Sequence, residues 1–245
     1  MVDEMHATYS KLKEDAQSLH KALLKNPFFA FVEAGEFQDD FVELLAIKQL
    51  RYNLAFVSAL ARMRSTFSNS PEFVVEFLDP HIATEFGGDL HVVDLKQPGQ
   101  THIAMVYDLV RSTGLQPECV GGADPTVERF LKNAITGLVG GRDKARALGA
   151  LYADEILANA WFAPIHRGLA AFDRRTNRGL DLEFFRTHAD EIEPAHEDHA
   201  LLIFGYRNRL NLDRERFDAG VAEFVDELDR MFTALHAKAS ERVRI

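Results

Sequence analysis

The sequence predicts an all-α protein, folded as a single-domain bundle of about seven helices. Apolar residues recur at helical spacing along most of the chain, and no segment alternates with the two-residue period of a strand. No linker, internal repeat or low-complexity stretch divides the sequence. Of the 245 residues, 47% are hydrophobic and 19 are Phe, enough to build a sizeable core. We therefore expect one domain over residues 1–245.

The first half of the chain gives four segments between natural breaks. An amphipathic helix is expected over residues 7–25, and a connecting turn over the Phe-rich residues 27–37. A long helix follows over residues 39–67. The next helix is expected over residues 70–87, because a Ser-Pro pair suits its first turn and a Gly pair suits its end.

The second half begins after a Gly- and Pro-containing loop. Helices are expected over residues 101–114, 124–140 and 143–172. A single helix from about residue 181 then carries a run rich in His and acidic residues. The last helix is expected over residues 213–238.

Composition excludes several classes of function. The formal net charge of −10 argues against a nucleic-acid surface, which needs clustered Lys and Arg. The single cysteine, Cys119, forms no intramolecular disulfide and fits a reducing compartment. The sequence has no apolar run long enough to cross a bilayer, and its N-terminus lacks the apolar core of a signal peptide. We expect a cytoplasmic protein with no membrane or nucleic-acid partner.

Three carboxylates and three imidazoles lie on helices that are otherwise apolar on one face. Burying such groups without a partner is costly. Two divalent cations in a shared pocket would satisfy all of them. These candidate metal ligands are Glu85, His102, Glu155, His188, Glu193 and His196.

The densest group is the run from His188 to His196. Glu193 and His196 are three residues apart and so share a helix face, and Glu-x-x-His is the spacing that di-iron bundles use. Pro194 removes a backbone donor, and a locally widened turn there would bring His188 and Glu193 into one pocket. The alternative is a solvent-facing helix with no ligand role.

The other candidates also have alternatives. Glu155 is flanked by a broad apolar arc, whereas we expect its neighbour Asp154 to face outward. A salt bridge to an arginine would satisfy a buried Glu155 equally well. His91 competes with His102 as a ligand, and His199 is a further candidate to replace one of the set.

These residues in this order resemble the haem-oxygenase-like di-iron oxidase and oxygenase family. Its helical fold is shared with the thiaminase-II and pyrroloquinoline-quinone-synthase proteins. The matching segments are ATEFGG, THIAMVYDLVRSTGL, LYADEILANAWFAPIHRGL and FFRTHADEIEPAHEDHALLIF. The last reads His-x4-Glu-x2-His, one residue longer than the family's His-x3-Asp-x2-His. The resemblance implies a haem-oxygenase-like fold with all six candidates as ligands.

The resemblance also implies a function. It predicts an O2-dependent non-haem di-iron oxidoreductase with two ferrous ions (Fe2+) and dioxygen as co-substrate. The substrate would be a small amine- or carboxylate-bearing molecule, such as an amino acid, an amino-acid derivative or a fatty acid. Hydrogen abstraction, C–C cleavage or N-oxygenation would oxidise it in a biosynthetic pathway. An external electron donor and a homodimer are further expectations.

Other functions remain open at this point. The same fold supports metal-free oxidases and thiaminase-like hydrolases, although Cys119 lies in a Gly- and Pro-rich loop away from the ligand helices. His20 is a possible axial ligand for haem. A non-catalytic helical scaffold is the remaining alternative. Iron content without a Soret band would favour the di-iron prediction over these.

Overall fold

The computed structural model describes residues 14–86, 101–190 and 193–242. All regular secondary structure in these ranges is helical, which confirms the all-α prediction. Buried apolar side chains from both halves of the chain form one hydrophobic core. In the same ranges, no helix has the length and apolar character that a membrane span requires.

Most helices begin and end close to the predicted boundaries. Residues 14–23 are helical and precede the first complete α-helix. The α-helices are α2 (Pro27–Ala34), α3 (Asp39–Thr66), α4 (Pro71–Phe73), α5 (Asp79–Phe86), α6 (His102–Ser112), α7 (Pro125–Phe130), α8 (Lys144–Thr176), α9 (Glu183–Asp190), α10 (Glu193–Arg209) and α11 (Arg214–Arg242). Two π-helical segments continue α-helices, η1 (Val74–Leu78) between α4 and α5 and η3 (Leu131–Val139) after α7. A short 3-10 turn, η2 (Pro117–Cys119), lies between α6 and α7.

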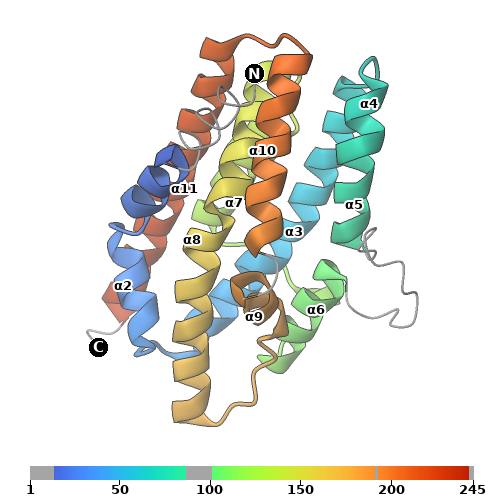
Figure 1. The fold of residues 1–245 in the computed structure, drawn as a ribbon. Helices are drawn as coiled ribbons and strands as arrows, with labels where there is room; N and C mark the ends of the chain where they lie inside the picture. The colour runs from blue at the N-terminus through green and yellow to red at the C-terminus, as the bar shows by residue number, and fades with distance from the viewer. Residues whose placement is uncertain (1–13, 87–100, 191–192, 243–245) are drawn as a thin grey trace.

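Helix α8 is the centre of the bundle. It packs against α2 and α11 on one side and against α9 and α10 on the other. Helix α3 packs against α5, α6 and η3, so it closes the other side of the molecule. Figure 1 shows this arrangement, with α8 and α10 in the middle, α2 and α11 to the left and α4, α5 and α6 to the right.

Glycines bring α8 unusually close to its neighbours. A Cβ atom on Gly149 would lie 2.1 Å from the backbone oxygen of Phe217, and one on Gly220 would lie 2.2 Å from that of Arg146. The backbones of α8 and α11 therefore touch where they cross. This contact fixes the height of α8 in the bundle, and with it the side chains at the middle of α8.

The expected turn over residues 27–37 is wrong, because most of it forms α2. The side chain of Asn26 accepts a hydrogen bond from the backbone N–H of Phe28 at 3.0 Å and so caps the first turn. Gly35 ends the helix with a left-handed φ of 67°. Phe28 and Phe29 are buried, so the aromatic residues of this segment anchor a helix in the core.

The single helix expected from residue 181 is also wrong, because the segment forms two helices, α9 and α10. Figure 1 shows that they run in different directions. Pro194 is the second residue of α10, where a missing backbone N–H breaks no helical hydrogen bond. The proline therefore suits a helix start instead of widening a turn. In the described ranges the chain has ten α-helices, α2 to α11, besides the helical residues 14–23, against the seven or so expected; α2, this division and the separation of α4 from α5 by η1 add to the number.

Candidate metal centre

The middle of α8 supplies Glu155, whose carboxylate meets histidines from two other helices. Oε1 of Glu155 lies 3.1 Å from Nε2 of His81 on α5, and Oε2 lies 3.7 Å from Nδ1 of His199 on α10. One ligand atom from each of these three residues lies within 4.8 Å of the other two. His81 and Glu155 are buried and His199 is partly exposed. One carboxylate with two imidazoles is a donor set that suits iron and similar transition metals.

A second group contains Glu85, His102 and His188, all buried. Nδ1 of His102 lies 3.1 Å from Oε1 of Glu85, and the ring centres of His102 and His188 are 4.4 Å apart. Nδ1 of His188 donates to the backbone oxygen of Phe184 at 2.6 Å, because a carbonyl oxygen can only accept. In the neutral ring the lone pair is then on Nε2, which is the nitrogen that can coordinate a metal.

One small cavity connects the two groups. It has a volume of about 30 Å³, close to the space that one water molecule or ion takes. Glu85 and His188 of the second group and Glu155 of the first line it. Aromatic and small apolar side chains make up much of the remaining wall: Phe56, Ala158, Phe162 and Phe184. The carboxylates therefore face a shared, apolar-walled space.

Asp154 adds a third buried carboxyl to this cavity, which contradicts the expectation that it faces outward. Its two oxygens lie 2.7 and 2.6 Å from the Tyr52 hydroxyl, which donates to them. Burial, and then the negative charge of Glu155, raise the pKa of Asp154 to about 8. Burial and the charge of Asp154 likewise hold the pKa of Tyr52 well above its usual value. Asp154 is therefore protonated at neutral pH.

The histidines and the other carboxylates shift each other's pKa in opposite directions. Burial alone would raise the pKa of Glu85, but the neighbouring His102 and His81 outweigh it and the pKa is lowered. Burial alone would lower the pKa of His81, but the charge of Glu155 outweighs it and the pKa is raised. Negative charge thus dominates the cavity and favours a cation.

Buried polar residues of α3 support Glu85 from behind. Nδ2 of Asn53 donates to Oε2 of Glu85 at 3.4 Å, and Nε2 of Gln49 donates to Oδ1 of Asn53 at 2.8 Å. Nζ of Lys48 donates to Oε1 of Gln49 at 3.2 Å and lies 3.6 Å from the ring centre of Trp161. Burial lowers the pKa of Lys48 well below its usual value, although the charge of Asp154 opposes this. The chain of hydrogen bonds fixes the orientation of one candidate ligand.

The chemistry of His81 fits a bound metal. Its Nε2 is 3.1 Å from Glu155, yet neither ring nitrogen has an aligned hydrogen bond to any described residue. Buried polar atoms are almost always hydrogen-bonded, so such a ring calls for another partner. A metal ion takes lone pairs from imidazole and carboxylate alike, and so satisfies both groups of the close contact.

The structure brings together four of the six sequence-predicted ligands: Glu85, His102, Glu155 and His188. Glu193 and His196 lie in the first turn of α10, but their side chains are outside the described part of the chain, as is His91. His199, left open from the sequence, contacts Glu155. The sequence prediction missed His81. Its spacing of four residues from Glu85 on one helix was the signal available.

Two other sequence candidates lie elsewhere. Nε2 of His20 is in contact with the backbone oxygen of Ile156, so that ring nitrogen is engaged by the protein. Cys119 ends η2, and its side chain is outside the described residues.

Comparisons with known proteins give one partial sequence match and a shared fold. No family model matches the chain. A stretch of 145 residues, 58% of the chain, is 29% identical to the 4-chloro-allylglycine synthase of Streptantibioticus cattleyicolor and covers 54% of that protein, about half its length. A crystal structure of a CADD-like protein of unknown function from Nostoc punctiforme matches 95% of this chain and 99% of its own with a TM-score of 0.71. A second crystal structure of that protein gives a TM-score of 0.64. At 16% identity, both show a common fold.

Proposed function

We propose that this chain is an O2-dependent non-haem di-iron oxidoreductase of the haem-oxygenase-like type, acting on an amino acid or a related amine- or carboxylate-bearing molecule. One observation carries the proposal: Glu85 and Glu155, each in contact with a histidine, face the same buried cavity. The partial similarity to a synthase whose named product is an amino acid supports the substrate class. C–C cleavage, hydrogen abstraction and N-oxygenation are the candidate reactions.

The two groups of side chains would each hold one ferrous ion. His81, Glu155 and His199 form the first set, and Glu85, His102 and His188 form the second. Glu193 and His196, at the start of α10, remain proposed further ligands. Two ferrous ions in this setting would supply electrons and open coordination positions to dioxygen.

The surrounding residues have separate tasks. Phe56, Phe162 and Phe184 keep bulk water out of the cavity. Asp154 holds a proton on its carboxyl at neutral pH, within hydrogen-bonding distance of the Tyr52 hydroxyl. Asn53 orients Glu85 through a hydrogen bond to Oε2. An external electron donor is needed to restore the ferrous state, and we expect the chain to work as a homodimer in the cytoplasm.

The proposal is tested by anaerobic titration of metal-free protein with ferrous iron. We expect about two irons per chain, and rapid oxygen uptake when the loaded protein is mixed with its substrate class. Free amino acids and medium-chain fatty acids form the substrate panel, with products identified by mass spectrometry. Glu155→Gln and His81→Asn should each remove at least one iron.

A matched control is His236→Asn, because His236 lies on α11, stacks edge-on against Phe31 and takes no part in the cavity. It should bind iron like the unchanged chain. Iron binding near zero, or iron loss that is equal in the His81 and His236 variants, would overturn the proposal. A Soret band in the purified protein would favour the haem alternative.

A further inference from the structure

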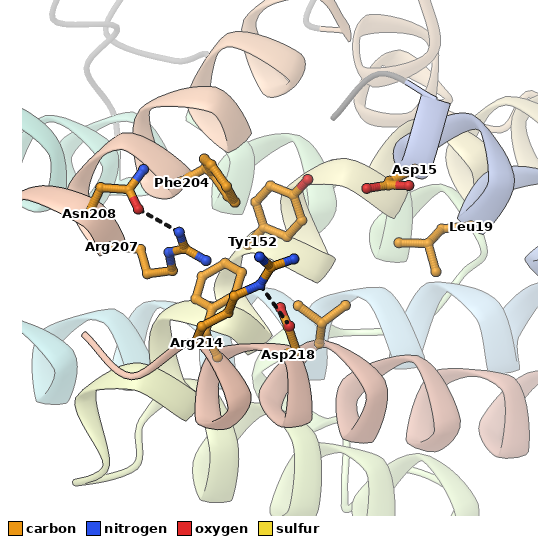
Figure 2. A pocket seen from close by; sticks show the side chains of 10 residues that line it. Asp15, Leu19, Tyr152, Phe204, Arg207, Asn208, Arg214 and Asp218 are labelled. Atoms are coloured by element: carbon orange, nitrogen blue, oxygen red, sulfur yellow. Dashed lines mark hydrogen bonds and ion pairs between the residues drawn. The ribbon is translucent and has the colours of Figure 1, made fainter. Parts of the chain in front are cut away.

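A second cavity, larger than the one in the candidate metal centre, lies elsewhere in the bundle. Its volume is about 590 Å³, within the range of small-molecule sites. Residues from the helix over 14–23, α8, α10 and α11 line it (Figure 2). None of the residues that line it belongs to the candidate metal centre. Any ligand here would therefore be held by different side chains.

The walls combine a large aromatic surface with a few charges. Tyr152, Phe204 and Phe217 form the aromatic part, with ring centres of Tyr152 and Phe217 5.5 Å apart and those of Phe204 and Phe217 6.3 Å apart. The charged groups are two arginines, Arg207 and Arg214, and two aspartates, Asp15 and Asp218. Such a lining suits a ligand with an apolar body and a single polar end.

Of the two arginines in this cavity, Arg207 is the one that forms no ion pair with a described carboxylate. Its guanidinium carbon lies 4.4 Å from the ring centre of Phe204 and 5.7 Å from that of Phe217, and it donates to the side-chain oxygen of the neighbouring Asn208. Across the described ranges it makes no ion pair. Arg214, by contrast, pairs with Asp218 at 3.5 Å. Burial, and then the like charge of Arg214, lower the pKa of Arg207 more than the charge of Asp218 raises it, so a bound anion would stabilise the guanidinium.

Tyr152 adds a ring and a neutral hydroxyl to the cavity. The residue is buried, and Figure 2 shows its ring between Arg207 and Asp15, with the hydroxyl on the side of Asp15. Burial and the charges of Asp15 and Asp218 raise the pKa of Tyr152 to about 12, so the hydroxyl keeps its proton at neutral pH. The hydroxyl therefore adds no charge to the cavity, and the ring adds a third aromatic face for the body of a ligand.

We propose that this cavity binds a small organic monocarboxylate with an aromatic or aliphatic body. The carboxylate accepts hydrogen bonds from Arg207, and the body packs on Tyr152, Phe204 and Phe217. A planar carboxylate matches the fork of a guanidinium. A doubly charged phosphate is disfavoured, because Asp15 and Asp218 lie in the same wall.

The test is calorimetric titration of the full metal-free chain with hydrocinnamate, and in parallel with hydrocinnamamide, its uncharged isostere. We expect saturable binding of the acid and at least tenfold weaker binding of the amide, since a hydrogen bond to a charged group contributes about 1.5–3 kcal/mol. Arg207→Gln should weaken binding of the acid at least tenfold.

Arg111→Gln is the matched control. Arg111 also lies over an aromatic ring, 5.6 Å from that of Tyr107, but it is exposed and paired with Asp108. It should bind hydrocinnamate unchanged, as should Glu155→Gln in the metal centre. Circular dichroism establishes that each variant folds. The proposal would be overturned by equal binding of acid and amide, or by no binding at millimolar acid. Loss of hydrocinnamate binding in Glu155→Gln but not in Arg207→Gln would also overturn it.

Discussion

The protonated state of Asp154 makes a stability prediction that can be worked out from the structure. Asp154 is 5% exposed, hydrogen-bonded to the Tyr52 hydroxyl and next to Glu155 in the chain. Its pKa is about 8 in the folded protein, against 3.8 for an unperturbed aspartate. Replacing it with Asn keeps the size and an oxygen that accepts from Tyr52. Asp154→Asn therefore removes the titration and little else.

The sign follows from which state binds the proton. The folded state keeps the proton of Asp154 where the unfolded chain has lost it, so folding stability falls as pH rises through this range. One pKa unit corresponds to about 1.4 kcal/mol, so the free energy of unfolding should fall by about 1.4 kcal/mol per pH unit between roughly pH 5 and pH 7. The accumulated cost by about pH 8 is about 5 kcal/mol. The Asn variant has no such cost.

Urea unfolding of metal-free protein measures this effect. The free energy of unfolding is compared between the unchanged chain and Asp154→Asn at about pH 5.5, 6.5 and 7.5. The variant should gain relative stability by about 1.4 kcal/mol with each pH unit. Asp226→Asn, at an exposed position of α11 paired with Arg230, serves as control and should leave the slope unchanged. A stability difference between Asp154→Asn and the unchanged chain that stays constant with pH would refute the reasoning.

Three further predictions follow from packing and from the metal centre. Gly220→Ala should lower the free energy of unfolding by about 3 kcal/mol in urea, because the added Cβ would meet the backbone oxygen of Arg146. As its control, Gly205→Ala has open space around the added Cβ and should raise the free energy of unfolding by about 0.5–1 kcal/mol. Asn26→Ala should cost about 2 kcal/mol by the same measurement, because the Asn26 side chain caps α2 and also donates to the Asp229 carboxylate of α11; an unchanged midpoint would contradict this. Co2+ affinity, followed by visible absorption, should fall between about pH 8 and about pH 6, since protons compete for His81, whose pKa is raised; a pH-independent affinity would contradict His81 as a ligand.

The sequence predicted most helices because their apolar periodicity is long and uninterrupted. Helix α3 was predicted over residues 39–67 and spans Asp39–Thr66. The sequence prediction failed for α2, where a Pro and many Phe residues suggested a turn. The capping signals were present: Asn26 before a proline, and Gly35 eight residues after it. A helix of eight residues shows too few turns for its periodicity to be distinguished from a loop.

The sequence predicted part of the group of polar residues that surrounds the buried cavity. Glu85, His102, Glu155 and His188 stand out because polar groups interrupt apolar faces, and the structure places them around or beside one cavity. Asp154 was expected to face solvent because two adjacent residues of a helix point in different directions, and Glu155 was expected to face the core. Both are nevertheless buried, because α8 is enclosed on all sides by α2, α3, α9, α10 and α11. Burial on all sides of a central helix depends on tertiary packing, which local periodicity does not contain.

The polar face of α3 gives independent support for a functional cavity. The side chains of Lys48, Gln49 and Asn53 are buried, and each loses its hydration on folding. Apolar side chains of similar size would fill the same space without this cost. The hydrogen bonds of these three polar residues run toward Glu85 and end there. Replacing such a chain by apolar residues of similar size is often neutral or stabilising, so fold stability alone does not require it. This chain of hydrogen bonds holds the Glu85 carboxylate in one orientation, and a metal ligand needs such an orientation.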